Sequence, residues 1–287
     1  MAEPPAPSEK AVEVNGLELH YKDWGGEGVP AIALHGFALN HHSFDEVAPA
    51  LNDVVRVLAF DQRGHGLSQW AAALSDYTRE TMVGDVAGMV EAFGFERVVL
   101  VGHSMGGMNA MTYAARHPDR VSALVLIDIG PAVSVDGAEQ VRRFVAGPYA
   151  LESLEAWVEL THQYYPQRSK ERIRERLAVS LRETSDGAGS SESRWAKQYD
   201  ERFRNVDFSG IGSASDDLWD VARSLRCPTL VVRGGESPVL TAEGARAFAE
   251  AVDVVEVVTI EGAGHSVAGD KPEEFVAAVR TFLQRVL

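Results

Sequence analysis

Short runs of apolar residues alternate along the chain with amphipathic stretches. Seven runs rich in Val, Leu and Ile are mostly continuous, which is typical of strands buried on both faces of a sheet. They cover residues 17–24, 31–34, 54–60, 97–101, 121–127, 228–232 and 254–260. Apolar residues recur at helical spacing in residues 78–93, 105–116, 241–251 and 271–287. This order predicts an α/β fold in which helices flank a mostly parallel sheet.

Residues 132–218 interrupt this alternation. They contain charged segments with helical character at 137–145, 150–164 and 169–184, and they lack a strong strand-like run. We therefore expect a helical cap inserted into one α/β core, whose two parts are residues 11–131 and 219–287. Residues 1–10 are rich in Pro and have neither a basic nor an apolar run, so they are predicted to be a disordered tail rather than a signal peptide.

Charge narrows the possible partners. The chain has 27 Lys and Arg residues against 42 Asp and Glu residues, a net charge of −15. An acidic surface of this kind repels nucleic acid and anionic membrane surfaces, and no apolar run reaches the roughly 18 residues that a bilayer span needs. The single cysteine, Cys227, begins an apolar run and is expected to be a buried thiol. We predict a soluble, cytoplasmic protein whose partner is a small molecule.

One motif carries a specific chemistry. The sequence Gly102-His103-Ser104-Met105-Gly106-Gly107 lies between a predicted strand and a predicted helix. A G-x-S-x-G pattern in this context presents a serine on a sharp strand-to-helix turn, where the helix N-terminus stabilises negative charge. Glycines allow the strained turn and the close approach of neighbouring backbone. Ser104 is thus a candidate nucleophile, although a serine that merely caps the helix would fit the same pattern.

With this motif the chain resembles the α/β-hydrolase superfamily. His35-Gly36-Phe37 looks like that family's oxyanion-hole segment, which implies that the backbone N–H groups of Phe37 and Met105 hold the carbonyl oxygen of a substrate. Residues 61–68 are similar to the family's D-x-R-G-x-G-x-S loop, whose role is mainly structural, and we interpret His65 accordingly. The resemblance also implies chemistry that needs no cofactor.

His265 is the candidate general base among nine histidines. It follows the last predicted strand and precedes the last predicted helix, so it should lie above the carboxyl edge of the sheet, beside Ser104. This position matches the family's Ser…Asp/Glu…His order. An exposed loop histidine is the alternative. The other histidines, His41 and His42 included, lack the spacing expected of metal ligands, so no metal is predicted.

The acid of the site departs from the commonest family pattern. Ser237 occupies the expected acid position in the turn 234–237, and Glu236 lies one residue earlier. Asp128 ends the strand that follows the nucleophile helix, a place that several family branches use. We favour Asp128 as the carboxylate that orients His265 and keep Glu236 as the alternative. Asp128 could also be a turn former before Gly130-Pro131.

These residues together predict a serine hydrolase that cleaves a carboxylic ester through an acyl-enzyme. Three aromatic residues of the predicted cap, Trp157, Tyr164 and Trp195, either line a substrate pocket or pack the cap onto the core. Lactone, amide or carbon–carbon bond hydrolysis on the same three residues remains an alternative. So does a slow or non-catalytic ligand-binding receptor on this fold. The sequence leaves the acyl size and the oligomeric state open.

Overall fold

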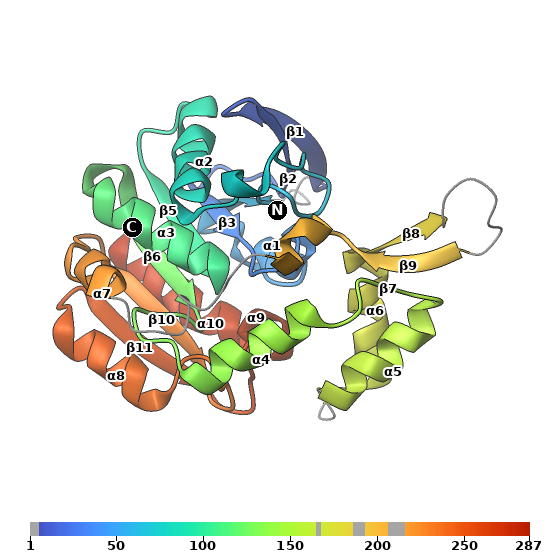
Figure 1. The fold of residues 1–287 in the computed structure, drawn as a ribbon. Coiled ribbons are helices and arrows are strands. Elements are labelled where there is room, and N and C mark those ends of the chain that lie inside the picture. Colours follow the sequence, from blue (N-terminus) through green and yellow to red (C-terminus); the bar gives the residue numbers. More distant parts are fainter. Residues whose placement is uncertain (1–5, 165–167, 186–192, 206–215) are drawn as a thin grey trace.

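Eight strands form the central sheet of the computed structural model, in the order β1-β2-β4-β3-β5-β6-β10-β11 (Figure 1). The structure describes residues 6–164, 168–185, 193–205 and 216–287. The first two strands, β1 (Ser8–Val14) and β2 (Leu17–Asp23), run antiparallel to their neighbours. The parallel strands are β3 (Val29–Leu34), β4 (Val55–Phe60), β5 (Val98–His103), β6 (Val121–Ile127), β10 (Thr229–Gly234) and β11 (Val255–Ile260). The predicted α/β fold is confirmed, and all seven predicted strands agree to within two residues at each end.

Helices cover both faces of this sheet because successive side chains of each strand point to opposite sides. Ile32 and Leu34 of β3 belong to one apolar cluster, whereas Ala31 and Ala33 belong to another. Four helices pack on the first cluster: α2 (Arg79–Ala92), α3 (Met105–Arg116), α7 (Asp216–Arg223) and α8 (Ala242–Ala251). Three pack on the second: α1 (Ala48–Leu51), α9 (Val267–Asp270) and α10 (Pro272–Val286). Burial on both faces explains why the strands are continuously apolar. Cys227 is buried, as predicted.

The first strand corrects the prediction of a disordered tail. Residues 8–10 belong to β1, which pairs with β2 from Ser8 opposite Asp23 to Val14 opposite Leu17. This strand lies at the edge of the sheet, and most of its side chains are exposed to water. Because exposed positions are occupied by polar residues, β1 has no continuous apolar run of the kind found in the buried strands. Residues 1–5 of the predicted tail lie outside the described residues.

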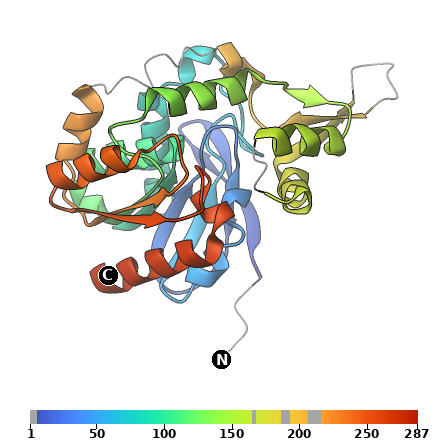
Figure 2. The same cartoon turned by 90° about the horizontal axis from the view of Figure 1, so that it is seen from below.

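A long insertion separates β6 from β10, although the two strands are neighbours in the sheet. The inserted segment (residues 132–218) contains α4 (Val135–Ala146), α5 (Leu154–Tyr164) and α6 (Lys170–Ser180). Helices α5 and α6 project from one side of the core, whereas α4 lies along it (Figure 2). The segment is helical as predicted in α4, α5 and α6, but it also contains strands that were not predicted, because β7 (Ala150–Leu151), β9 (Ser193–Lys197) and β8 (Leu181–Ser185) form a second, antiparallel sheet. These strands are short and polar, which is why the pattern of the chain did not distinguish them from helix.

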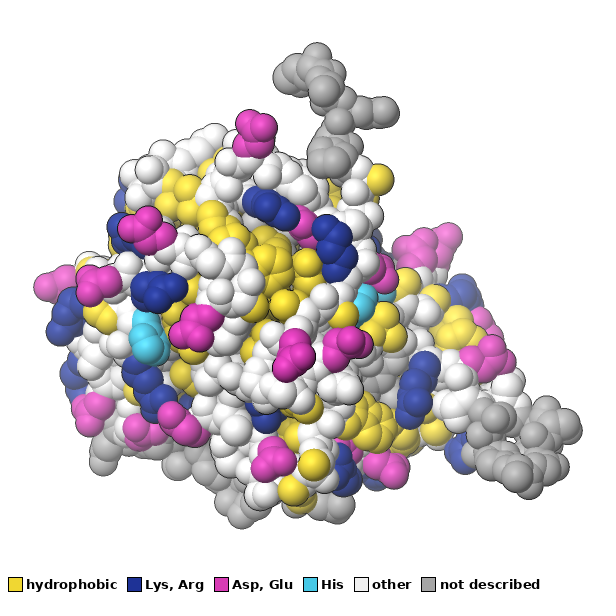
Figure 3. Space-filling model, turned by 90° about the horizontal axis from the view of Figure 1, so that it is seen from above, with side chains coloured by type: hydrophobic (Ala, Val, Ile, Leu, Met, Phe, Trp, Pro, Cys, Tyr) yellow, Lys and Arg dark blue, Asp and Glu magenta, His cyan; other side chains and the backbone are white. Residues whose placement is uncertain are grey.

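The remaining elements are short 3-10 helices: η1 (His41–Phe44), η2 (Leu74–Asp76), η3 (Pro118–Arg120) and η4 (Glu201–Asn205). Within the described ranges, no helix combines the length and the apolar character needed to cross a membrane. Acidic and basic side chains are interspersed on the face shown in Figure 3, around a central group of hydrophobic side chains. On that face the excess of acidic residues does not form a patch of a single sign.

Candidate active site

Ser104 lies on the predicted strand-to-helix turn, between the end of β5 and the first residue of α3. Its backbone has φ 50° and ψ −115°, a left-handed conformation that is strained for a residue with a side chain. The glycines beside it are needed for packing. A Cβ atom on Gly102 would lie 2.5 Å from Cα of Gly107, and one on Gly106 would overlap the backbone of Leu34. The turn therefore fixes Ser104 at the N-terminus of α3.

Asp128 and His265 meet at the carboxyl edge of the sheet. Nδ1 of His265 lies 2.7 Å from Oδ2 of Asp128, which is fully buried directly after β6. The carboxylate also accepts hydrogen bonds from the backbone N–H of Gly234 at 2.9 Å and from the hydroxyl of Ser237. Because a carboxylate accepts at Nδ1, Nε2 of His265 is left with its lone pair. Two donors besides the imidazole thus hold the Asp128 carboxylate in place against His265.

Glu236, the alternative acid, has a different environment. It is exposed and, among the described residues, makes no hydrogen bond or ion pair with His265. Ser237, at the position where the family most often has its acid, donates its hydroxyl to Asp128 instead. The structure therefore brings Asp128, and not Glu236, to the imidazole.

Ser104 and His265 line the same cavity, which has a volume of about 390 Å³. Phe37 lines it too, and its ring packs edge-on against Phe203 with centroids 5.2 Å apart. A Cβ atom on Gly36 would lie 3.3 Å from Cβ of Ser104, so the segment that carries Phe37 lies directly against the serine. Met105, the first residue of α3, follows Ser104 and lines a smaller cavity of about 60 Å³ next to it. Both segments predicted to supply N–H groups therefore border Ser104.

The three aromatic residues of the inserted segment lie in different places. Trp157 is buried, lines the cavity and donates its indole N–H to the carbonyl of Trp195 at 2.7 Å. Tyr164 also lines the cavity, and about half of its surface (47%) is exposed. Trp195 is not among the residues that line the cavity, so its prediction as a substrate-binding residue is not supported.

Two buried histidines that the sequence did not single out as catalytic support this region. His103 donates from Nε2 to the carbonyl oxygen of His265 at 2.9 Å, and the two rings are 4.7 Å apart. Burial, and then the neighbouring His265, lowers the pKa of His103 well below its usual value, so its ring is neutral. His65 is fully buried beside Phe37, and burial lowers its pKa to about 3. Both rings act as neutral packing and hydrogen-bonding groups.

Three cationic residues of the cavity were missed by the sequence analysis: Arg168, Arg176 and Lys197. One signal could have identified Arg176. The residues of α6 that line the cavity recur at helical spacing, namely Ile173, Arg176, Leu177 and Ser180. An arginine on the apolar stripe of an amphipathic helix faces the interior rather than water.

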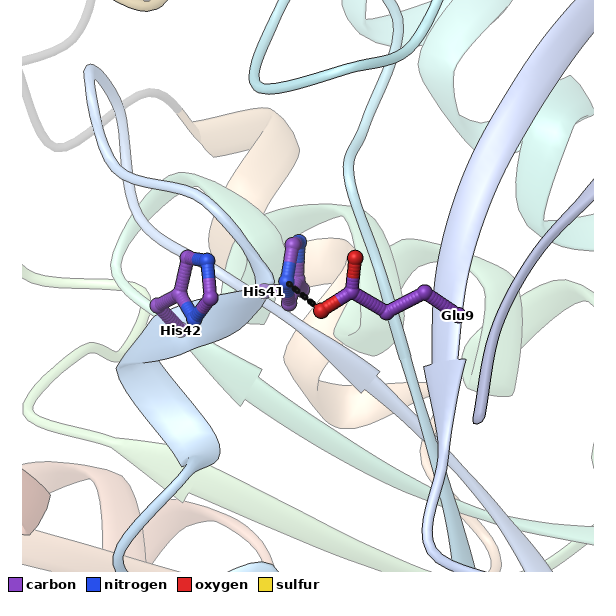
Figure 4. A group of neighbouring side chains, drawn as sticks. All are labelled: Glu9, His41 and His42. Atoms are coloured by element: carbon purple, nitrogen blue, oxygen red, sulfur yellow. Dashed lines mark ion pairs between the residues drawn. The ribbon is translucent and has the colours of Figure 1, made fainter. Parts of the chain in front are cut away.

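A group of side chains outside this cavity could hold a metal ion. Glu9, His41 and His42 have possible ligand atoms within 4.8 Å of one another (Figure 4). Nδ1 of His41 lies 3.0 Å from Asp61, an arrangement that leaves Nε2 for a ligand or an ion pair, and this Nε2 lies 3.8 Å from Glu9. The argument from spacing missed this group because Glu9 comes from β1. Glu9 also lies 3.8 Å from His41 and 3.7 Å from His20, contacts that need no metal and become ion pairs when the imidazoles are protonated.

A strained serine on such a strand-to-helix turn, which shares its cavity with a carboxylate-bound histidine, places the protein among the hydrolases built on an α/β sheet. The comparison with known families agrees. The model of the alpha/beta hydrolase fold family matches residues 30–272, and the chain belongs to that family.

Individual relatives cover nearly the whole chain. The 2-(acetamidomethylene)succinate hydrolase of Mesorhizobium japonicum is 28% identical and aligns with 96% of this chain and 94% of its own. An esterase of Mycobacterium tuberculosis is 31% identical, over 91% of this chain and 84% of its own. The crystal structure of an alpha/beta hydrolase from Novosphingobium aromaticivorans is 29% identical and superposes with a TM-score of 0.86, over 98% of this chain and 99% of that one.

Proposed function

We propose that this protein is a serine hydrolase that cleaves carboxylic esters through an acyl-enzyme, with Ser104, His265 and Asp128 as its catalytic triad. The observation that carries the proposal is the 2.7 Å contact between His265 and buried Asp128 at the cavity that contains Ser104. The strained backbone of Ser104 supports it, since residues held in such conformations cluster at functional sites.

The proposed reaction has two steps. His265 Nε2 takes the proton of the Ser104 hydroxyl while the serine oxygen attacks the ester carbonyl. The backbone N–H groups of Phe37 and Met105 donate to the resulting oxyanion. His265 then returns the proton to the leaving alcohol, and an acyl-enzyme forms. A water molecule, deprotonated by the same imidazole, releases the acid, while Asp128 stabilises the imidazolium in both steps.

The inserted segment is proposed to act as a cap on the core formed by residues 11–131 and 219–287. It supplies much of the cavity wall, including Trp157 and Tyr164. The esterase from M. tuberculosis supports ester cleavage, whereas the Mesorhizobium relative is named for a different substrate. Lactones, amides and carbon–carbon bonds therefore stay as alternatives for the same site.

The proposal is tested by turnover of p-nitrophenyl esters of graded acyl length. The wild-type protein should hydrolyse at least one of them, and Ser104→Ala should lower kcat by more than about 10⁴-fold, as for serine hydrolases in general. Circular dichroism checks that the variant is folded. No turnover of any ester, with turnover of lactones or amides, would move the assignment to those bonds. Binding without any turnover would favour the receptor.

A further inference from the structure

The charge of the cavity is opposite to the charge of the chain. The whole sequence has a net charge of −15, yet the described residues that line the cavity include three cations and one carboxylate, Glu236. The cations are Arg168, Arg176 and Lys197, and all of them come from the inserted segment. A cavity with low-dielectric walls concentrates the field of such charges and raises the local concentration of an anion.

Arg176 is the cation of greatest interest. It lies on the stripe of α6 that faces the cavity, between Ile173 and Ser180, and its guanidinium packs against Gly269. Among the described residues it makes no hydrogen bond or ion pair. Burial, and then the neighbouring Arg168, lowers the pKa of Arg176, although the carboxylates of Asp270 and Glu46 partly oppose this shift. A carboxylate bound in the cavity would add hydrogen bonds that the guanidinium does not receive from the described residues.

Arg168 connects this charge to the proposed catalytic loop. Its Nη2 lies 2.6 Å from Oδ1 of Asp270, and both side chains are largely buried. The other oxygen of Asp270 accepts from the backbone N–H of Gly264, directly before His265. Arg168 is thus held on the cavity wall by an ion pair that also fixes the loop that carries the imidazole.

Lys197 adds positive charge from β9. It is 5% exposed, and its ammonium lies 5.5 Å from the ring of Trp157 and 5.8 Å from the ring of Tyr199. Burial, and then Arg204, lowers its pKa to about 8, so it is largely protonated at neutral pH. Glu236 on the same cavity would repel an anion, and this repulsion orients a bound anion toward the cationic wall.

From this arrangement we propose that the substrate carries a carboxylate in addition to the bond that is cleaved, and that Arg176 binds this carboxylate. A half-ester of a short dicarboxylic acid has the required chemistry. A guanidinium pairs with a carboxylate through two parallel hydrogen bonds, which gives orientation as well as attraction. The inference rests on the proposed function for the cleavage step. The recognition of the anion depends only on the residues of the inserted segment.

The test compares substrates that differ in charge and little in size. Monomethyl glutarate and methyl pentanoate place the carboxylate in the acyl part, and 4-acetoxybenzoate and its methyl ester place it in the leaving group. In the wild type we expect kcat/KM to be at least about tenfold higher for the anionic member of one pair. Arg176→Gln should remove this preference, mainly by raising KM for the anion, and should change kcat/KM of the neutral ester less than about threefold. Arg176→Lys should restore part of the preference.

The matched control is Arg174→Gln. Arg174 lies on the same helix but forms an exposed ion pair with Glu155 and does not line the cavity, so its loss should leave the preference unchanged. Equal use of both esters in each pair, or equal effects of Arg176→Gln on anionic and neutral esters, would overturn the inference. If no ester is cleaved, the proposed function fails, but the inference about the anion site can still be tested. Calorimetry then measures whether glutarate binds to the wild type and to Arg176→Gln. Binding that Arg176→Gln weakens supports the inference, and the absence of binding to the wild type refutes it.

Discussion

Asp128 and Ser237 show, at the scale of single residues, how a carboxylate and a hydroxyl share the region beside His265. The sequence offered two positions for the carboxylate, after β6 and in the turn after β10, and the structure places these positions side by side. Ser237, in the later turn, donates its hydroxyl to the Asp128 carboxylate. A second carboxylate at that position would face the first one in a buried site and repel it. A hydroxyl at position 237 is compatible with Asp128 as the proposed acid of the triad.

This arrangement predicts unequal effects of two substitutions. Asp128→Asn should leave the fold intact but favour the wrong imidazole tautomer and remove the charge that stabilises the imidazolium. By analogy with serine proteases, kcat should fall about 10⁴-fold, which corresponds to roughly 5 kcal/mol. Glu236→Gln should lower kcat about tenfold or less, since Glu236 is exposed and makes no bond to His265. The measurement is kcat/KM on one activated ester, with circular dichroism as the control for folding.

Ser237→Ala tests the hydrogen bond that supports the Asp128 carboxylate. It removes one of three donors to Asp128 and keeps the carboxylate, so about a tenfold loss is expected. If Glu236→Gln lost most of its kcat/KM while Asp128→Asn stayed close to the wild type, the assignment of the acid would be reversed. Similar, modest losses in both would mean that the two carboxylates substitute for each other.

At the scale of elements, what the sequence predicts depends on burial. Strands covered on both faces, such as β6, are mostly apolar and were predicted to within two residues at each end. The edge strand β1 and the strands of the small sheet, such as β8, have one or both faces in water. Their polar residues break the apolar pattern, so these strands were not predicted from the sequence. The order of strands and helices along the chain was enough to predict that Ser104, Asp128 and His265 lie at one edge of the sheet, because parallel strands end at the same edge.

The wall of the cavity could not be predicted in the same way. Many of its charged and aromatic residues come from the inserted segment, among them Trp157 of α5, Arg176 of α6 and Lys197 of β9, and their grouping depends on how that segment packs on the core. Nothing in the sequence distinguished Trp157 from Trp195 as a residue of the cavity wall. In the structure one ring lines the cavity and the other does not. Such a difference arises from tertiary packing, which the local pattern of apolar and polar residues does not specify.

This difference predicts how the inserted segment controls substrate range. Tyr164→Ala and Trp157→Leu should enlarge the cavity and shift the ratio of kcat/KM between bulky and short esters toward the bulky ones, by about tenfold. Trp195→Ala is the matched control and should keep the wild-type ratio. Leu is chosen at position 157 because truncation of a buried tryptophan to Ala costs about 3–5 kcal/mol of stability. An unchanged ratio in both cavity variants would contradict the proposed role of the segment.

For the whole molecule, net charge and local charge give different information. The net charge of −15 led to the prediction that nucleic acid is not a partner, and the interspersed charges in Figure 3 fit a surface without a basic patch on that face. The cavity nevertheless concentrates cations from the inserted segment. Composition therefore describes the surface of the molecule, while the charge that a substrate meets follows from the fold.

The most direct test of the account is covalent labelling of the whole protein with a fluorophosphonate. Activation by His265 and a pre-formed oxyanion site should make the Ser104 oxygen attack the phosphorus and displace fluoride. Intact-mass spectrometry should show a single adduct, peptide mapping should place it on Ser104, and esterase activity should disappear in proportion. Ser104→Ala should remain unlabelled. An adduct on another residue, or no adduct on folded protein, would contradict the assignment of Ser104 as the nucleophile.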